Sequence, residues 1–481
     1  MLFNSFEFLI FLPIAVIGYY SIAHKYRWAW LLASSYYFYM AHEPELVILL
    51  IFSTITDYFC GIKIFEASRK NIKRNYLLLS IITNVGILIV FKYLFFFTSN
   101  LQGILAFFGA RTINVEETSS YNFSAILLPV GISFYTFQTM SYSIEIYRGR
   151  ILPEKHLGKF ALYVAFFPQL VAGPIERASR LLPQIKSKIP LSITNLQQGM
   201  VVAAWGFFLK LVVADRLGIY VDAAFSTPDS PHNLALILGS IFFCFQIYYD
   251  FAAYTSIALG VAKIMGFDLI QNFNRPIFAT SIAEFWKRWH ISFTTWLRDF
   301  IYFPLRKSKK VSRVTAVFIV FFINGLWHGA SWTFVIWSLL NALLLILEIA
   351  TTRYRKRLFN FLGLTQKMRG LLGWFTIFCL IILTLVFFRA PNIANAFTYV
   401  EHMFKFGSFH INIIDNYFEL ILSLFLILCV QYIFYKKGND KIYELFTKRK
   451  TVTKYAISLT YIIIMVLFAI NRQNSFIYFQ F

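Results

Sequence analysis

Charged residues are scarce in this sequence of 481 residues: they make up 14% of it, against 58% hydrophobic and 20% aromatic residues. Soluble globular chains carry about 25% charged residues, so the composition excludes that class. Uncharged apolar runs long enough to cross a bilayer recur along the whole chain, and their continuity is unlike the short alternating strands of a membrane β-barrel. The sequence therefore predicts an all-α, polytopic membrane protein with about 11–13 membrane segments, some of them broken or re-entrant around a central cavity.

Acidic residues are especially few, with 23 Asp and Glu against 45 Lys and Arg, which gives a net charge of +22. The basic residues cluster in short connections between apolar runs, as expected for cytoplasmic loops of a membrane protein. This distribution indicates retention in a lipid bilayer and gives no reason to expect a nucleic-acid partner. We expect the segments 63–74, 148–159 and 353–369 to face the cytoplasm and the weakly acidic segment 111–121 to face outside.

Cysteine is also rare, and the four that occur (Cys60, Cys244, Cys379 and Cys429) lie singly in apolar runs. They predict neither a disulfide framework nor a metal site. The chain lacks a glycine-rich phosphate loop, a nucleophile-elbow pentapeptide and an HExxH motif. It contains no Gly/Ser/Pro-rich linker, which predicts one integral-membrane domain over residues 1–481. No internal repeat is visible, which argues against a transporter built from two related halves.

The most informative stretch is Val314 to Leu347, which contains no Lys, Arg, Asp or Glu over 34 residues. As one helix it would measure about 50 Å, whereas a bilayer core is about 30 Å thick. We therefore expect a tilted or broken helix, with the break or a close backbone approach at Gly325 or Gly329. His328 lies beside this point, and a buried imidazole needs a polar partner or a wet cavity.

Other stretches predict further irregular elements. Residues 2–23 read as a first membrane helix and not as a removable signal. Two prolines and a glycine interrupt residues 160–188, which predicts a broken helix inside the protein. Asp57 lies in an apolar run and is expected to accept a hydrogen bond from a neighbouring helix. Aromatic residues recur every three or four positions from Glu284 to Arg306, the pattern of a helix on the membrane surface, and His290 falls within it.

Several sequence blocks, taken together, carry a family resemblance. They are Met1 to Ser5, Leu128 to Tyr135, Gly173 to Ile175, Tyr249 to Phe251, Glu284 to Ser292, Asn324 to Gly329, Phe387 to Ala390 and Phe476 to Phe481. In this order they resemble the membrane-bound O-acyltransferase (MBOAT) family, and within it the bacterial branch that includes the membrane subunit of alginate O-acetylation. One departure is Ala252-Ala253, where the family pattern has a serine and a glycine.

The resemblance implies an MBOAT-like fold and an O-acyltransferase of the bacterial cytoplasmic (inner) membrane. It places His328 in the position of the catalytic histidine and His290 in that of a second functional histidine. Acetyl-CoA is then the acyl donor, as a substrate, and no bound cofactor is implied. The acceptor is an extracytoplasmic polysaccharide, such as an alginate-like exopolysaccharide or peptidoglycan, reached directly or through a secreted or periplasmic acetyltransferase partner.

The residue chemistry agrees with this assignment. A hydroxyl must lose a proton as it attacks a thioester, and an imidazole titrates in the right range. Asn324 and Ser331 are available as donors to the developing oxyanion, and Asp250 and Trp327 complete the predicted substrate-binding set. We expect His290 and His328 to approach one cavity in unequal roles, with His290 kept neutral by the cations beside it in sequence.

Four alternatives remain open at this stage. On residue pattern alone, either histidine could have a purely structural role. A metal site is not expected, because no third ligand stands at helical spacing to either histidine. D-alanyl transfer towards teichoic acid is the nearest enzymatic alternative. A membrane transporter or flippase shares the same hydropathy, and a non-catalytic assembly subunit is the last alternative, which the presence of both histidines disfavours.

Overall fold

The computed structural model describes residues 1–41, 44–109, 131–405, 417–438, 442–470 and 476–477. Across these ranges the chain is helical and has no strand, which confirms the predicted all-α class. The segment 111–121, expected to face outside, is not among the described residues. Two compact units can be distinguished: unit 1 comprises Met1–Asn195 and Ala262–Leu269, and unit 2 comprises Leu196–Val261 and Ile270–Phe481. The single domain expected over residues 1–481 stays a prediction.

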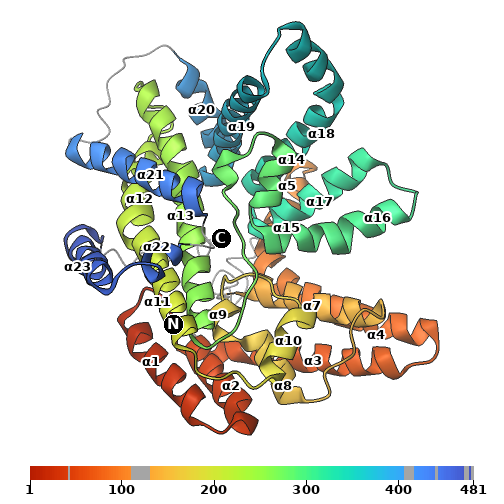
Figure 1. Cartoon of the computed structure of the whole chain (residues 1–481). Coiled ribbons are helices and arrows are strands. Elements are labelled where there is room, and N and C mark those ends of the chain that lie inside the picture. Colours follow the sequence, from red (N-terminus) through yellow and green to blue (C-terminus); the bar gives the residue numbers. More distant parts are fainter. Residues whose placement is uncertain (42–43, 110–130, 406–416, 439–441, 471–475, 478–481) are drawn as a thin grey trace. The chain divides into compact units, whose positions relative to one another are not determined.

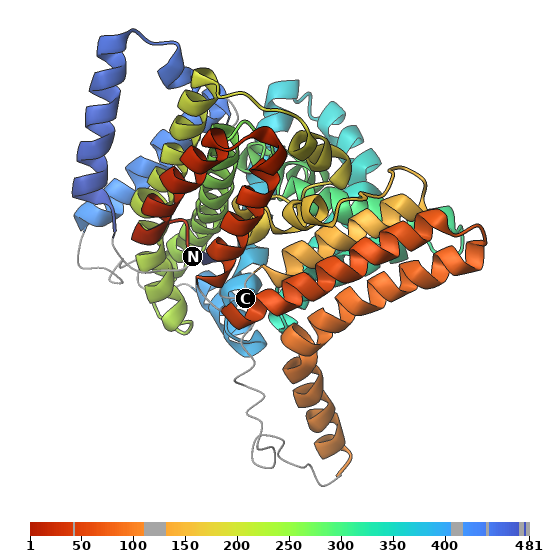
Figure 2. The ribbon, with the colours of Figure 1, turned by 90° about the horizontal axis from the view of Figure 1, so that it is seen from below.

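The described part of unit 1 is helical (Figures 1 and 2). They are α1 (Phe6–Ser21), α2 (His24–Met40), the 3₁₀ turn η1 (Pro44–Leu46), α3 (Val47–Glu66), α4 (Lys70–Leu88), the π-helical turn η2 (Ile89–Tyr93), α5 (Leu94–Phe107), α7 (Ile132–Tyr147), α8 (Leu157–Ala165), α9 (Phe167–Leu170) and α10 (Ala178–Lys186).

Helices α3, α4 and α7 pack side by side in unit 1 (Figure 2). Asp57 of α3 is fully buried among them. One carboxylate oxygen accepts hydrogen bonds from the hydroxyls of Ser80 and Ser143, the latter at 2.8 Å, and the other accepts one from the Asn84 amide at 2.6 Å. These contacts confirm that Asp57 faces other helices, and they offset the desolvation of its carboxyl group.

The predicted break within residues 160–188 is confirmed. Helix α8 ends at Ala165, the four-residue helix α9 carries Pro168 in its first turn, and no helix forms between Leu170 and Ala178. Proline lacks the backbone N–H that a continuing helix needs. This irregular backbone is buried within unit 1, as required for non-helical structure at membrane depth.

Unit 2 holds the remaining helices (Figure 1). They are α11 (Ile193–Phe208), which begins in unit 1, the π-helical turn η4 (Leu209–Ala214), α12 (Asp215–Ser226), α13 (Asn233–Ile264), which ends in unit 1, the 3₁₀ turn η5 (Pro276–Phe278), α14 (Ile282–Arg288), α15 (Ile291–Leu297), the π-helical turn η6 (Arg298–Tyr302), α16 (Phe303–Lys307), α17 (Arg313–His328), α18 (Trp332–Phe361), α19 (Gln366–Arg389), α20 (Ile393–Phe404), α21 (Tyr417–Lys437), α22 (Glu444–Thr447) and α23 (Thr451–Phe468).

Seven helical segments of the described chain are long and apolar enough to cross a membrane. They are Pro44–Glu66, Lys70–Phe107, Asn233–Ile264, Trp332–Phe361, Gln366–Arg389, Glu419–Lys437 and Thr451–Phe468. The apolar helices α1 and α17 are shorter. Large apolar side chains are exposed along these segments, as at Ile17, Ile82 and Val466, which suits contact with lipid tails. The polytopic class is therefore confirmed, while the count of 11–13 segments, which included broken pieces, stays a prediction.

One expected element was wrong: residues Glu284 to Arg306 do not form a single helix on a surface. They form α14, α15, η6 and α16, with a break at His290. The aromatic side chains that recur at this spacing are buried. They are Trp286, Trp289, Phe293, Trp296 and Phe300. A spacing of three or four residues places side chains on one helix face, but it does not reveal whether lipid or protein covers that face.

Candidate active site

The uncharged run from Val314 to Leu347 folds into a helical hairpin that positions His328. Helix α17 ends at His328, and α18 starts at Trp332, so the predicted break is confirmed. A Cβ on Gly325 would lie 2.8 Å from the Phe334 carbonyl oxygen and from the Val335 Cα. Glycine at position 325 therefore allows the two backbones to approach closely.

Polar contacts fix the register of this hairpin. The Asn324 amide donates to the Ser338 hydroxyl at 2.8 Å, and that hydroxyl donates to the Phe321 carbonyl at 2.5 Å. Ser331 caps α18, its hydroxyl accepting the backbone N–H of Thr333 at 3.3 Å. Asn324 and Ser331 thus support the hairpin, and the roles predicted for them towards substrate stay predictions.

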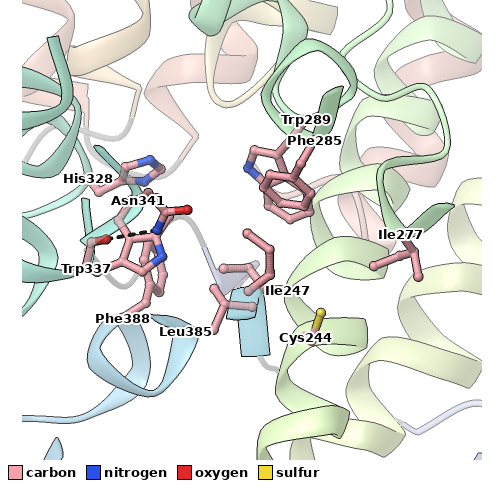
Figure 3. A pocket seen from close by; sticks show the side chains of 11 residues that line it. Cys244, Ile247, Ile277, Phe285, Trp289, His328, Trp337, Asn341, Leu385 and Phe388 are labelled. Atoms are coloured by element: carbon pink, nitrogen blue, oxygen red, sulfur yellow. Dashed lines mark hydrogen bonds between the residues drawn. The ribbon is translucent and has the colours of Figure 1, made fainter. Parts of the chain in front are cut away.

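His328 is only 4% exposed and lies at the wall of a cleft within unit 2 (Figure 3). Its ring meets the rings of Trp337 at 5.0 Å and Phe388 at 5.3 Å, both edge to face. Figure 3 shows His328, Asn341 and Trp337 on one side of the cleft and Trp289 and Phe285 on the other. The rest of the wall is apolar and comes mainly from α13 and α19. It includes Cys244, Ile247, Ile277, Ile381 and Leu385.

His290 occupies the break between α14 and α15 with a left-handed backbone conformation (φ 44°, ψ 53°). This conformation costs a non-glycine residue about 1–2 kcal/mol, so its surroundings must hold it. Asn272 does so from the preceding connection. Its carbonyl accepts the Ile291 N–H at 2.9 Å, and its side-chain oxygen accepts the Ser292 hydroxyl at 2.6 Å.

The surroundings of His290 are aromatic. Its ring, 1% exposed, lies 4.8 Å from Phe251, 5.0 Å from Phe293 and 5.4 Å from Trp327. His290 lies outside the seven membrane-length segments, and burial lowers its pKa to about 3. It is therefore neutral at physiological pH, but the cause is desolvation by aromatic neighbours. The contribution expected from nearby cations stays a prediction.

The two histidines contact a common pair of rings. Phe293 and Trp327 stack with centroids 4.0 Å apart, and both His290 and His328 contact each of them. Trp327 is thus a buried link between the imidazoles. His328 lines the cleft, whereas His290 is not part of the described lining. Their shared approach to one cavity and their unequal roles stay predictions.

Asp250 belongs to a buried charge cluster away from the lining of the cleft. Lys210, on the π-helical turn η4, lies 2.7 Å from Asp250 and 2.9 Å from Asp215. The second oxygen of Asp250 accepts the backbone N–H of Ile477 at 2.7 Å, and the Phe476 ring lies 4.5 Å from the Lys210 ammonium. The cluster thereby anchors the described part of the C-terminal segment, and the substrate role expected for Asp250 stays a prediction.

Three residues that line the cleft with His328 were missed by the sequence prediction: Asn341, Trp289 and Trp337. Asn341 belongs to α18 and lies 13 positions after His328, in the same uncharged run, where a polar amide among apolar residues was the available signal. Trp289 and Trp337 gave no separate signal, because tryptophan is abundant around both histidines. All four cysteines carry free thiols. The absence of a metal and of a bound cofactor stays a prediction.

Comparison with known proteins shows which family this chain belongs to. A profile of the membrane-bound O-acyltransferase family matches residues 155–390, a range that contains both His290 and His328. The chain belongs to the membrane-bound O-acyltransferase family, and it is an O-acyltransferase embedded in a membrane.

The similarity to individual relatives extends over most of the chain. A probable alginate O-acetylase of Pseudomonas aeruginosa is 34% identical over 418 residues, which covers 86% of this chain and 76% of the relative. A peptidoglycan O-acetyltransferase of Helicobacter pylori is 32% identical over 437 residues, covering 84% and 80%. A teichoic acid D-alanyltransferase of Bacillus subtilis is 29% identical over 235 residues, covering 45% and 58%. These relatives confirm the resemblance to the alginate-type branch.

Proposed function

We propose that the chain transfers an acetyl group from cytoplasmic acetyl-CoA, across the bacterial cytoplasmic membrane, towards the hydroxyl groups of an extracytoplasmic polysaccharide. The observation that carries this proposal is a buried imidazole, His328, at the wall of an otherwise largely apolar cleft. The relatives named for O-acetylation of alginate and of peptidoglycan cover more of the chain than the D-alanyltransferase does. The hydroxyl that is acetylated belongs to the glycan itself or to a partner acetyltransferase.

The chemistry follows from the position of His328. Its neutral imidazole accepts the hydroxyl proton as the oxygen attacks the thioester carbonyl carbon. The C–O ester bond forms, the C–S bond breaks, and the coenzyme A thiolate leaves and takes up the proton. Negative charge develops on the carbonyl oxygen in between, and a donor in a dry cleft stabilises it strongly. Figure 3 shows the indole nitrogen of Trp289 facing His328 across the cleft, and we assign it this task.

Membrane vesicles with the cytoplasmic face outward test the proposal. Vesicles containing the chain are formed so that they enclose de-O-acetylated surface polysaccharide from the same organism, and acetyl-labelled coenzyme A is added outside, at the cytoplasmic face. We expect hydroxylamine-releasable label on the polysaccharide, absent with vesicles that lack the chain. Parallel vesicles with the D-alanine activation system and labelled D-alanine should give none. Label from D-alanine and none from acetyl-CoA would transfer the assignment to the alternative reaction.

A further inference from the structure

Asn341 brings a buried hydrogen-bond acceptor to the cleft beside His328. The residue has 0% exposure. Its amide nitrogen donates to the Trp337 carbonyl oxygen at 2.9 Å and to the Thr384 hydroxyl at 3.3 Å. Because a backbone carbonyl only accepts hydrogen bonds, the amide orientation is fixed, and Oδ1 is the remaining end of the group.

That oxygen is directed at the cleft. Figure 3 shows the Asn341 oxygen pointing away from Trp337 towards the space in front of Phe285. Within the described residues, Oδ1 accepts no hydrogen bond. A buried carbonyl without a partner costs about 1–3 kcal/mol, so a ligand that supplies a donor at this point gains binding energy. The site therefore favours a molecule with an N–H or O–H group opposite Asn341.

The attacking hydroxyl does not meet this requirement. A hydroxyl has one proton, and His328 takes it in the reaction, so the same group cannot also donate to Asn341. A sugar ring with several hydroxyls would leave most of them unpaired against Ile247, Ile381 and Leu385. The walls instead suit an aliphatic chain that carries a single N–H group. A pantetheine thioester has this structure, with an amide N–H two carbons from the sulfur.

We propose that Asn341 Oδ1 accepts a hydrogen bond from the amide N–H nearest the thioester of the acyl donor. The inference rests on the proposed function and identifies a residue that positions its donor. The hydrogen bond holds the sulfur, and with it the acyl carbonyl, at a fixed distance from the α18 backbone, in the same cleft as His328. Asn341 acts on donor binding and takes no part in proton transfer.

Two variants separate this role from a structural one. In purified wild-type protein that turns over acetyl-CoA, Asn341→Ala should raise the KM for acetyl-CoA about tenfold, the equivalent of about 1.4 kcal/mol, and leave kcat within about threefold. Thr384→Val removes the hydroxyl that Asn341 meets on α19 and keeps the side-chain shape. It should leave both constants unchanged. An unchanged KM in Asn341→Ala, or an equal rise in Thr384→Val, would overturn the proposal.

A pair of small donors tests the same hydrogen bond without a variant. S,N-diacetylcysteamine carries the amide N–H, and S,O-diacetyl-2-mercaptoethanol has an ester oxygen in its place. Competing with acetyl-CoA, the amide compound should inhibit the wild-type protein about tenfold better, and Asn341→Ala should lose this preference. Equal inhibition of the wild type by both compounds, including none by either, would contradict the role of Asn341. Failure of the wild type to use acetyl-CoA would instead refute the proposed function.

Discussion

His290 and His328 differ in their surroundings although both contact Phe293 and Trp327. His328 ends a helix and faces a cleft, whereas His290 is enclosed by aromatic rings and held in a left-handed conformation by Asn272. A proton acceptor must lie within reach of the reacting group. A residue that only positions other side chains can be fully enclosed by protein. The unequal roles, with His328 as the proposed base, stay a prediction that variants can test.

The unequal roles predict that the two histidine variants lose different amounts of activity. His290→Ala should retain measurable acetyl-CoA turnover, with a raised KM, because it weakens positioning and leaves the base in place. His328→Ala should have no measurable turnover with the same acceptor. Both are measured on purified protein with equal amounts of folded protein. If His290→Ala is inactive and His328→Ala is active, the division of roles is reversed.

Lys210 offers a second prediction at this scale. It is 1% exposed between two carboxylates, and removing it takes this positive charge away from both. Lys210→Met should lower stability by about 3–5 kcal/mol, seen as a large loss of monodisperse protein after detergent extraction. Lys405→Met removes a lysine from an exposed pair with Glu401 and should have little effect, since such pairs contribute about 0–1 kcal/mol. Equal yields from the two variants would refute the stabilising role of the cluster.

Some residues of the site could be predicted from the sequence, and others could not. His328 could be found because an uncharged run with flanking glycines surrounds it. Asn341 and Lys210 were missed because their importance depends on distant partners: Lys210 meets Asp250 40 positions away, and Asn341 meets α19 at Thr384. No local pattern reports such contacts.

Among the elements, the hairpin of α17 and α18 has the most direct bearing on the site, because His328 ends α17 shortly after Gly325, where the two backbones lie close together. Gly325→Ala would place a methyl group 2.8 Å from backbone atoms of α18, and backbone has little freedom to move away. We expect a loss of about 1–3 kcal/mol, seen as a lower temperature of half-inactivation, and reduced turnover through displacement of His328.

The control for this prediction is Gly370→Ala on α19. A Cβ at that glycine meets no atom within 4 Å, and alanine is the better helix former by about 1 kcal/mol. This variant should be as stable as the wild type or more so. A Gly325→Ala protein with unchanged stability and turnover would show that the close approach of α17 and α18 is not required.

The elements that could be predicted are those whose breaks have a local chemical cause. Proline and glycine residues predicted the helix breaks within residues 160–188 and near Gly329. The break at His290 has no such signal, because it is imposed by Asn272 and by buried aromatic packing. The same three-to-four-residue spacing serves a helix facing lipid and one facing protein, which is why the stretch Glu284 to Arg306 was misassigned.

On the scale of the whole molecule, the distribution of Lys and Arg predicts orientation in the membrane. Lys70, Arg150 and Lys367 are exposed positions in or beside the three basic segments. Each is replaced by cysteine in a background without the four native cysteines and probed with an impermeant maleimide on intact spheroplasts. We expect no labelling at these three positions and labelling of a cysteine placed within residues 111–121. Labelling of all three basic positions would show that the predicted orientation in the membrane is wrong.

The most direct test of the central claim is the amount of ester-linked acetate on the purified surface polysaccharide of cells that carry His328→Ala. His402→Ala, an equivalent substitution in α20 away from the cleft, serves as the matched control. Both variants must accumulate in the membrane as the wild type does. The account predicts no acetate above the level of the deletion strain for His328→Ala and the wild-type level for His402→Ala. Wild-type acetate in the His328→Ala strain would contradict it.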